Sequence, residues 1–175
     1  GEFIAFLDSD DWWTSEKLEI QMNLFEDKEV GLVYSNYYIY NEETQRKKLV
    51  SKKKLPSGTV TNSLLTNYNV GIITVIIRKV LFDRFKDGFD GKYNIIGDFD
   101  LTIRLAIKWK LNCIQTPIAI VRIHGKNESL LKRDKYIDEM KIWYNSMKDN
   151  SVISSTQGFD KYMEKILYLE TMESI

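Results

Sequence analysis

Three carboxylates packed into four positions near the start of the chain place the tightest constraint on its fold. Asp8, Asp10 and Asp11 follow residues 3–7, an apolar run of strand length that is too short for a helix. Side chains alternate along an extended chain, so Asp8 and Asp10 point to the same side, whereas Asp11 begins a turn. We therefore expect a buried strand that delivers paired acids to the edge of a sheet.

The paired acids predict a divalent cation. Two carboxylates this close repel each other, and one of them is pushed towards protonation unless a cation lies between them. Mg²⁺ and Mn²⁺ take oxygen ligands and are commonly held by one or two carboxylates plus the phosphates of a substrate. Asp10 is the expected direct ligand, and Asp8 is expected to bind directly or through water.

The same short motif has other interpretations. A calcium-binding EF-hand loop does not fit, because Trp12 and Trp13 stand where that loop needs alternating polar residues and glycine. A phosphatase whose nucleophile is the first aspartate of a strand-end Asp-x-Asp stays open, although it would want a small residue in place of Trp12. The simplest alternative is a polar turn in which Asp11 helps to cap the following helix.

The opening segment also resembles a known family. Residues 1–13 read Gly-Glu-Phe-Ile-Ala-Phe-Leu-Asp-Ser-Asp-Asp-Trp-Trp, and Glu-Lys-Leu follows at residues 16–18. This is similar to the metal-binding segment of family 2 glycosyltransferases, which are inverting nucleotide-sugar enzymes, and departs from it mainly at Ser15, where the family often has proline. The resemblance implies an α/β fold of GT-A (Rossmann-like) type, with a mixed sheet flanked by helices. Family members reach this segment only after the units that bind uracil and ribose, so the resemblance implies an N-terminally truncated domain.

Composition narrows the partners and the compartment. The chain of 175 residues is 43% hydrophobic and 29% charged, which is ordinary for a globular protein with a core. Basic and acidic residues number 25 each, so no net charge favours nucleic acid as a partner. The single cysteine, Cys113, cannot form an internal disulfide, and no apolar stretch reaches the length of a membrane span. We expect a cytoplasmic protein, with peripheral contact at the inner face of the plasma membrane left open.

Strand and helix patterns alternate along the chain and predict a layered α/β sheet. The expected strands cover residues 30–40, 72–77 (buried on both faces) and 111–123, with Pro117 marking an edge, a bend or a division into two short strands. Residues 41–57 carry six lysines and arginines and are expected to form a hairpin or mobile loop, usually a solvated face but able to contact a phosphate or a membrane surface.

Three short helices are expected between these strands. They cover residues 14–27, capped by Thr14 or Ser15 with an apolar face at Leu18, Met22 and Phe25; residues 58–67, capped by Thr59 or Thr61; and residues 78–85.

A second acidic motif opens a mid-chain helix. Residues 97–106 read Gly-Asp-Phe-Asp-Leu-Thr-Ile-Arg-Leu-Ala, and Asp98 stands where the helix dipole and capping donors favour a carboxylate, so on this pattern alone it is an N-cap. The segment also resembles the Glu-Asp-x-Asp-Leu-x-x-Arg-Leu of family 2 enzymes, with Asp100 and Arg104 matching and Gly97 in place of the usual glutamate. The resemblance implies that Asp98 is the general base that deprotonates the acceptor hydroxyl, a task that needs no strongly shifted pKa.

The only histidine, His124, completes the candidate site. A lone histidine is more often structural than a ligand. However, Arg122 and His124, followed by a polar loop to residue 129, resemble an Arg-x-His of the family whose histidine reaches the metal or the diphosphate in many members. Imidazole suits Mn²⁺ better than Mg²⁺, so a ligating His124 would favour manganese.

The end of the chain predicts two amphipathic helices from residue 134 onward, which by default pack on the domain or a partner, with membrane-surface contact left open. Their apolar stripes contain Tyr136, Ile137, Met140, Trp143, Tyr144 and Met147 in the first helix and Phe159, Tyr162, Met163, Ile166 and Leu167 in the second. We expect residues 1–130 to be a partial catalytic domain and residues 131–175 a helical extension.

Together the resemblances to family 2 enzymes imply a bacterial glycosyltransferase of cell-surface polysaccharide or lipooligosaccharide synthesis. The resemblance implies transfer of a sugar, with inversion, from a nucleotide-diphosphate donor, expected to be a UDP-sugar, to a hydroxyl of a glycan or lipid-linked acceptor. The alternatives are a non-catalytic interaction module and the phosphatase. The roles implied are metal binding by Asp8, Asp10 and His124 with Mn²⁺ or Mg²⁺, base catalysis by Asp98, and donor or acceptor binding by Asp11, Trp12, Trp13, Asp100 and Arg104.

Overall fold

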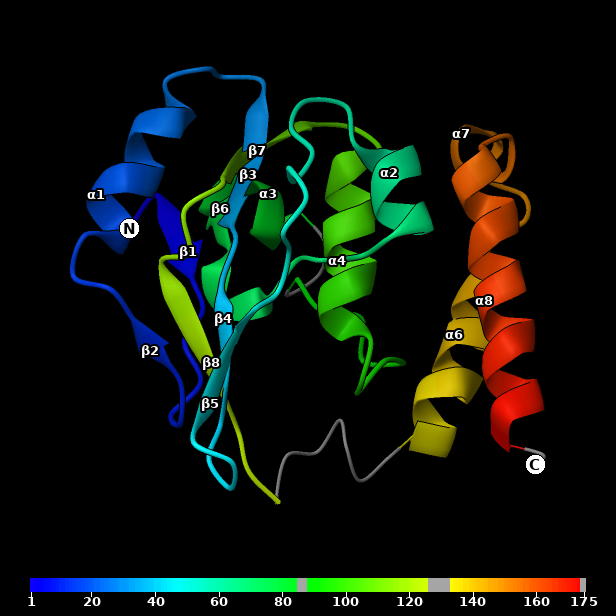
Figure 1. Ribbon diagram of the computed structural model, residues 1–175. Helices are drawn as coiled ribbons and strands as arrows, with labels where there is room; N and C mark the ends of the chain where they lie inside the picture. Colours follow the sequence, from blue (N-terminus) through cyan, green and yellow to red (C-terminus); the bar gives the residue numbers. More distant parts are fainter. Residues whose placement is uncertain (85–87, 126–132, 174–175) are drawn as a thin grey trace.

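The computed structural model describes residues 1–84, 88–125 and 133–173 and contains two four-stranded sheets flanked by helices (Figure 1). The first sheet is mixed, because its third and fourth strands are parallel and its second runs antiparallel to both neighbours. In spatial order its strands are β1 (Phe3–Ala5), β6 (Ile76–Arg78), β3 (Val30–Ser35) and β7 (Lys110–Ile114). The predicted mixed α/β fold class is confirmed.

The second sheet brings the first acidic motif close to His124. Its strands, in spatial order, are β2 (Trp12–Trp13), β8 (Ala119–Ile123), β4 (Tyr38–Asn41) and β5 (Arg46–Leu49). Strand β2 pairs antiparallel with β8, which ends directly before His124. The antiparallel pair β4–β5 confirms the hairpin expected within residues 41–57.

Strand β1 is shorter and more exposed than predicted. It ends at Ala5 instead of residue 7, and the side chain of Leu7 is 49% exposed. The reason lies in its place at the edge of the sheet, where β6 is its only paired neighbour in the part of the chain that the structure describes. The expectation of a buried strand was therefore wrong.

Helix α1 (Lys17–Met22), continued by the 3-10 helix η1 (Asn23–Phe25), buries only part of the predicted apolar face, because Phe25 is buried and Met22 packs beside it, but Leu18 lies outside the core. Lys17 and Gln21 are fully buried, whereas Leu18 is 47% exposed. The side-chain amide of Gln21 donates a 2.7 Å hydrogen bond to the carbonyl of Thr74, and the ammonium of Lys17 lies 4.2 Å from the ring centre of Trp13. These contacts explain why Lys17 and Gln21 are buried although the apolar pattern had predicted Leu18 in the core.

The capping predictions failed for both short helices. Helix α1 begins at Lys17 after Glu16, so neither Thr14 nor Ser15 caps it. Helix α2 (Thr61–Thr66) follows Val60, and no side chain caps it. Their buried packing therefore determines where these helices begin.

The three predicted strands are all divided, and residues 111–123 form the two short strands β7 and β8 that Pro117 allowed for. Residues 30–40 form β3 and β4, which belong to different sheets. Residues 72–77 begin with the 3-10 helix η2 (Ile72–Thr74), because the backbone N–H and the hydroxyl of Thr74 both donate to the carbonyl of Gly71, and β6 follows. Helix α3 (Lys79–Asp83) matches the predicted helix, whose end at Phe85 lies outside the described residues.

The helix that carries Asp98 and the C-terminal helices share one core. Helix α4 (Gly97–Ala106) is followed, beyond β8, by α6 (Arg133–Met147), α7 (Ser151–Ser154) and α8 (Gln157–Glu173). Figure 1 shows α2 and α4 between the sheets and the pair α6 and α8. The ring of Phe99 stacks on Tyr162 at 5.0 Å and meets Trp143 edge-on at 4.8 Å, contacts that add to the burial of these large rings. The expected packing of the C-terminal helices on the domain is confirmed, although Leu167 is exposed.

The predicted domain boundary between residues 130 and 131 and the polar loop at 126–129 lie outside the described residues. Every helix in residues 1–84, 88–125 and 133–173 is too short or too polar to cross a membrane.

Candidate active site

Asp10 and His124 meet at the end of the β2–β8 pair. The Nε2 atom of His124 lies 2.8 Å from Oδ2 of Asp10. This hydrogen bond is the main reason why the pKa of Asp10 is lowered from its ordinary value. Both side chains remain partly exposed, so a ligand from solvent can reach the pair.

Asp11 fixes the turn that presents this pair. Its Oδ1 atom accepts a 2.8 Å hydrogen bond from the backbone N–H of Arg122, two residues before His124. The guanidinium of Arg122 in turn donates a 2.6 Å hydrogen bond to the carboxylate of Glu42, which follows β4 in the turn of the β4–β5 hairpin. Burial raises the pKa of Asp11. Asp11 therefore joins the acidic motif to β8 and does not cap helix α1.

Asp98 is the second residue of α4 and is half-buried. Its carboxylate accepts a 2.8 Å hydrogen bond from the backbone N–H of Phe99, and the N-cap of the helix is Ile96, so the N-cap interpretation of Asp98 was wrong. Burial raises the pKa of Asp98 to about 6, and the charge of Asp8 adds to this effect. The carboxylate is thus a stronger base than an ordinary aspartate and is still mostly ionised at neutral pH.

A cavity of about 560 Å³, which we call the acidic cavity, is lined by Asp8, Asp11 and Asp98. Asp10 and His124 are not among its lining residues, but Asp10 directly precedes Asp11 in the chain. The structure therefore brings two carboxylates of the first motif and the aspartate of the second into one cavity. The Asp10–His124 pair is joined to this cavity through Asp11, the residue that follows Asp10.

The two tryptophans of the motif lie outside the lining of the acidic cavity. The indole N–H of Trp13 donates a 2.8 Å hydrogen bond to the carbonyl of Ile73, so this ring braces η2 against β2. Trp12 is 45% exposed, and its ring lies 6.0 Å from that of Tyr40. Trp12 is the more accessible of the two for stacking against a ligand.

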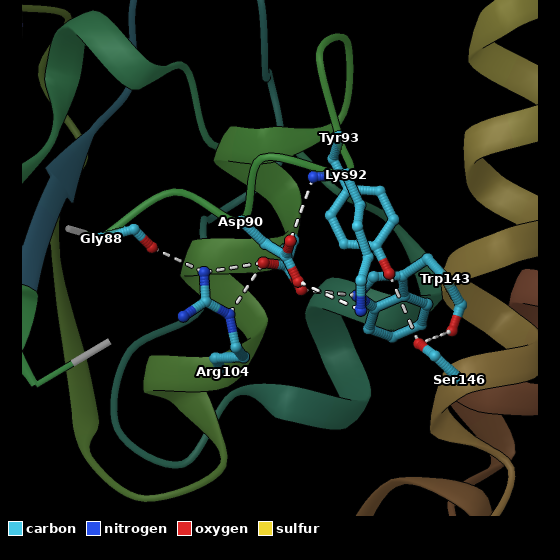
Figure 2. A network of polar contacts seen from close by, with 8 residues as sticks. Gly88, Asp90, Lys92, Tyr93, Arg104, Trp143 and Ser146 are labelled. Carbon is cyan, nitrogen blue, oxygen red and sulfur yellow. Dashed lines mark hydrogen bonds and ion pairs between the residues drawn. The ribbon is translucent and has the colours of Figure 1, made fainter. Parts of the chain in front are cut away.

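Asp100 and Arg104 form a buried network that faces helix α6 (Figure 2). Asp100 is 2% exposed and accepts hydrogen bonds from Arg104 Nε at 2.8 Å and from the indole of Trp143 at 3.1 Å. Arg104 also donates to the carbonyl of Gly88 at 2.7 Å. Burial raises the pKa of Asp100, and the charge of Arg104 opposes this. Neither residue lines the acidic cavity, and their contacts hold α4 against its neighbours.

Glu139 of α6 is a further residue at the site that the sequence analysis did not identify. Its carboxylate accepts hydrogen bonds from three consecutive backbone N–H groups, those of Asn94, Ile95 and Ile96, at 2.9, 2.8 and 3.1 Å. Burial acts to raise the pKa of Glu139, but these three donors lower it overall. Glu139 thereby fixes the segment that leads into Asp98. The available signal was an acid on the apolar stripe of the helix, beside Met140.

The donor atoms at the first motif fit a cation that is shared with a substrate. In the described part of the chain, no group of three or more His, Cys, Asp or Glu side chains is arranged to hold a metal ion. Asp10 and His124 offer one carboxylate and one imidazole, with Asp8 two residues away. This donor set suits Mn²⁺, and such sites are commonly completed by substrate phosphates and water.

Residues 1–88 match the family model described as Glycosyl transferase family 2. The chain belongs to this family. The family membership inferred from the first acidic motif is thereby confirmed, and the phosphatase interpretation is set aside. The second motif, at residues 97–106, lies outside the matched segment.

Curated relatives of this family 2 chain include UDP-Glc:alpha-D-GlcNAc-diphosphoundecaprenol beta-1,3-glucosyltransferase WfgD of Escherichia coli, 37% identical over 89 residues, which are 51% of this chain and 34% of the relative. WfaP of Escherichia coli, with the same activity in its name, is 35% identical over 77 residues, 44% of this chain and 29% of the relative. An uncharacterized glycosyltransferase of Rickettsia conorii is 29% identical over 136 residues, 78% of this chain and 22% of the relative. The chain thus spans about a third or less of the length of these relatives.

Solved structures show the fold of this family 2 chain. S. aureus TarS 1–349 in complex with UDP-GlcNAc superposes with a TM-score of 0.58 at 13% identity, covering 85% of this chain and 43% of that one. The structure of S. aureus TarS gives a TM-score of 0.57 at 12% identity and covers 95% and 28% of the two chains. The GT-A fold expected from the sequence is confirmed.

Proposed function

We propose that this chain carries the metal-binding and acceptor-activating residues of an inverting glycosyltransferase. The proposed reaction moves a sugar from a UDP-sugar to a hydroxyl of a glycan or lipid-linked acceptor in bacterial surface polysaccharide synthesis. The observation that carries the proposal is the shared cavity of Asp8, Asp11 and Asp98. The donor class is supported by the relatives named for UDP-Glc and by the complex of TarS with UDP-GlcNAc.

Asp98 acts as the general base in this proposal. An alcohol that attacks an anomeric carbon becomes acidic as the new bond forms, and a positioned carboxylate that accepts its proton typically contributes ~10²–10⁴ in rate. A pKa of about 6 leaves Asp98 mostly ionised at neutral pH while making it a better proton acceptor than an exposed aspartate. Glu139 and the Asp100 network hold the helix that presents it.

The first motif binds the donor diphosphate. Asp10 and His124 would hold Mn²⁺ or Mg²⁺ together with the donor diphosphate, with Asp8 contributing through water, and a cation bound there would neutralise the charge that builds on the departing diphosphate. Asp11 keeps the turn in place through its bond to the backbone of Arg122.

A lipid-linked acceptor would place the reaction at a membrane surface, so we propose peripheral association at the cytoplasmic face. The β4–β5 hairpin supports this proposal, because Arg46, Lys47 and Lys48 of β5 are exposed. Basic residues near an anionic leaflet contribute about 1 kcal/mol each to membrane binding.

Calorimetric titration of Mn²⁺ with and without UDP tests the metal and donor assignment. Coupled binding, in which UDP strengthens the affinity for Mn²⁺ and the variant Asp10→Asn abolishes the coupling, is the expected result. Asp160→Asn, which alters an exposed aspartate of α8, is the matched control. Binding of Mn²⁺ that is independent of both UDP and Asp10 would contradict the proposal.

A further inference from the structure

A second cavity, of about 430 Å³, also has Asp98 in its wall. We call it the helical cavity, because its other walls include Tyr136 of α6, Tyr162 and Lys165 of α8, and Thr66 and Asn67 at the end of α2. Its volume lies within the ~300–1,000 Å³ typical of small-molecule sites. Asp98 is therefore common to the acidic cavity and to a second hollow built largely by the C-terminal helices.

We propose that the helical cavity binds the acceptor, and that this acceptor is a glycosyl phosphate whose sugar lies inside the cavity and whose phosphate lies at Lys165. The inference rests on the proposed function, because it takes Asp98 as the base. A general base must lie within hydrogen-bond reach of the hydroxyl that it deprotonates. The donor sugar must approach the same hydroxyl, so a base in a wall shared by two cavities can serve a donor in one and an acceptor in the other.

The charges of the two cavities assign the substrates. The acidic cavity has three carboxylates, those of Asp8, Asp11 and Asp98, and accommodates a phosphate group only together with a cation. The helical cavity has one carboxylate, that of Asp98, and one ammonium, that of Lys165. An anionic acceptor without its own metal is therefore favoured in the helical cavity.

Lys165 is held at the rim of the helical cavity. Its ammonium donates a 3.3 Å hydrogen bond to the hydroxyl of Tyr136 and lies 5.9 Å from the centre of that ring. Within residues 1–84, 88–125 and 133–173, no carboxylate forms an ion pair with it. A phosphate oxygen at this ammonium would make a charge-assisted hydrogen bond, the stronger kind.

The interior of the helical cavity suits a sugar ring. Aromatic side chains, among them Tyr68 and Tyr136, supply apolar faces, and Asn67 and Thr66 supply polar groups for ring hydroxyls. The buried hydroxyl of Tyr162, in the same wall, has no hydrogen-bond partner among the described residues. Buried polar groups are normally paired, so this unpaired hydroxyl is an unusual feature of the cavity wall.

Nuclear magnetic resonance titration of the 175-residue chain tests the proposal, with N-acetyl-α-D-glucosamine 1-phosphate as the probe. N-acetylglucosamine and inorganic phosphate serve as its separate halves. We expect the probe to shift the backbone amides of Thr66, Asn67 and Ile95, and to bind more tightly than either half. Lys165→Met should weaken the probe about tenfold, as expected for loss of one charge-assisted hydrogen bond. Lys161→Met, on the exposed side of the same helix, should leave the affinity unchanged.

Several results would overturn the inference. The probe could leave these amides unshifted, shift residues of the acidic cavity instead, bind no better than inorganic phosphate, or lose equal affinity in the Lys161→Met and Lys165→Met variants. The Mn²⁺ and UDP titration keeps this failure separate from failure of the proposed function. Coupled binding of Mn²⁺ and UDP without probe binding would sink only the acceptor site. Probe binding without that coupling would sink only the donor assignment.

Discussion

The Nε2 atom of His124 lies 2.8 Å from Oδ2 of Asp10, although 114 positions separate the two residues in the chain. The antiparallel pairing of β2 with β8 produces this contact, with Trp12 opposite Ile120. A short strand pair therefore turns two distant residues into neighbouring donors of the kind that Mn²⁺ accepts.

Replacing the imidazole should weaken manganese binding selectively. His124→Gln removes the nitrogen donor and keeps a polar side chain, so we expect the affinity of the chain for Mn²⁺ to fall about tenfold or more and that for Mg²⁺, which prefers oxygen, to fall less. Calorimetric titration with each ion measures the difference, and thermal unfolding checks that the fold is retained. Equal losses for both ions would argue against a direct role of His124.

Neutralising the proposed base should cost activity and increase stability. The pKa of Asp98 is raised to about 6 in the folded chain, above the ~3.9 of an unfolded aspartate, so folded-state stability falls as the pH rises between these values. Asp98→Asn removes that loss, and we expect the free energy of unfolding at pH 7 to rise by about 1–3 kcal/mol, with no gain near pH 4. Urea denaturation at both pH values measures it.

The same substitution predicts the kinetics of the enzyme that carries this chain. Its rate should increase with pH through about 6 and then level off, because only the ionised form of Asp98 accepts a proton. Asp98→Asn should lower kcat by ~10²–10⁴ and remove this pH dependence. Asp160→Asn, at an exposed site on α8, should change neither stability nor rate. An unchanged pH profile in Asp98→Asn would rule out Asp98 as the base.

Glu139 should stabilise the fold in a pH-dependent way. Its pKa is lowered in the folded chain, so its contribution is present above the unfolded value of ~4.3 and is lost as the pH falls through the folded value. Glu139→Gln turns a donor group towards backbone N–H groups, and we expect a loss of about 1–3 kcal/mol at pH 7 that shrinks in acid. Glu164→Gln, on an exposed face, is the control for urea denaturation. Equal stability of Glu139→Gln and wild type at pH 7 would refute this role.

The Asp100 network should behave as a coupled unit. Trp143→Phe keeps a large ring but removes the indole donor to Asp100, and we expect a loss of about 1–3 kcal/mol because a buried carboxylate loses a partner. The double variant with Asp100→Asn should lose less than the sum of the single variants. Trp109→Phe makes the same change of ring at an indole that forms no hydrogen bond with the residues that the structure describes, and it serves as the control. Strict additivity of the Trp143 and Asp100 effects would show that the contact is energetically unimportant.

The sequence was most informative where local chemistry and pattern agree. The helix at 97–106, the hairpin after residue 41 and the strands on either side of Pro117 follow from periodicity and turn residues. Asp8 and Asp10 were found as candidates because paired carboxylates attract a cation. Asp98 and His124 were found through the family resemblance, because an aspartate at a helix start is ordinarily a cap and a lone histidine is ordinarily structural.

What the sequence could not supply depends on contacts between distant segments. Gln21 is buried because its amide donates a hydrogen bond to a carbonyl of η2, and Leu18, on another side of the helix, is exposed. The spacing of apolar residues contains no information about this contact. Glu139 acts on residues more than 40 positions earlier in the chain. The raised pKa of Asp98 likewise comes from tertiary burial, which a motif comparison does not contain.

The hydrogen bonds that Glu139 accepts from the segment before Asp98 have a consequence for biosynthesis. A ribosome makes the chain from its N-terminus, so α4 leaves the exit tunnel before α6 has been translated. Until α6 arrives, the three amides that precede Asp98 lack the carboxylate that orders them. The two sheets can therefore form before α6 emerges, but Asp98 is correctly placed only once α6 has emerged.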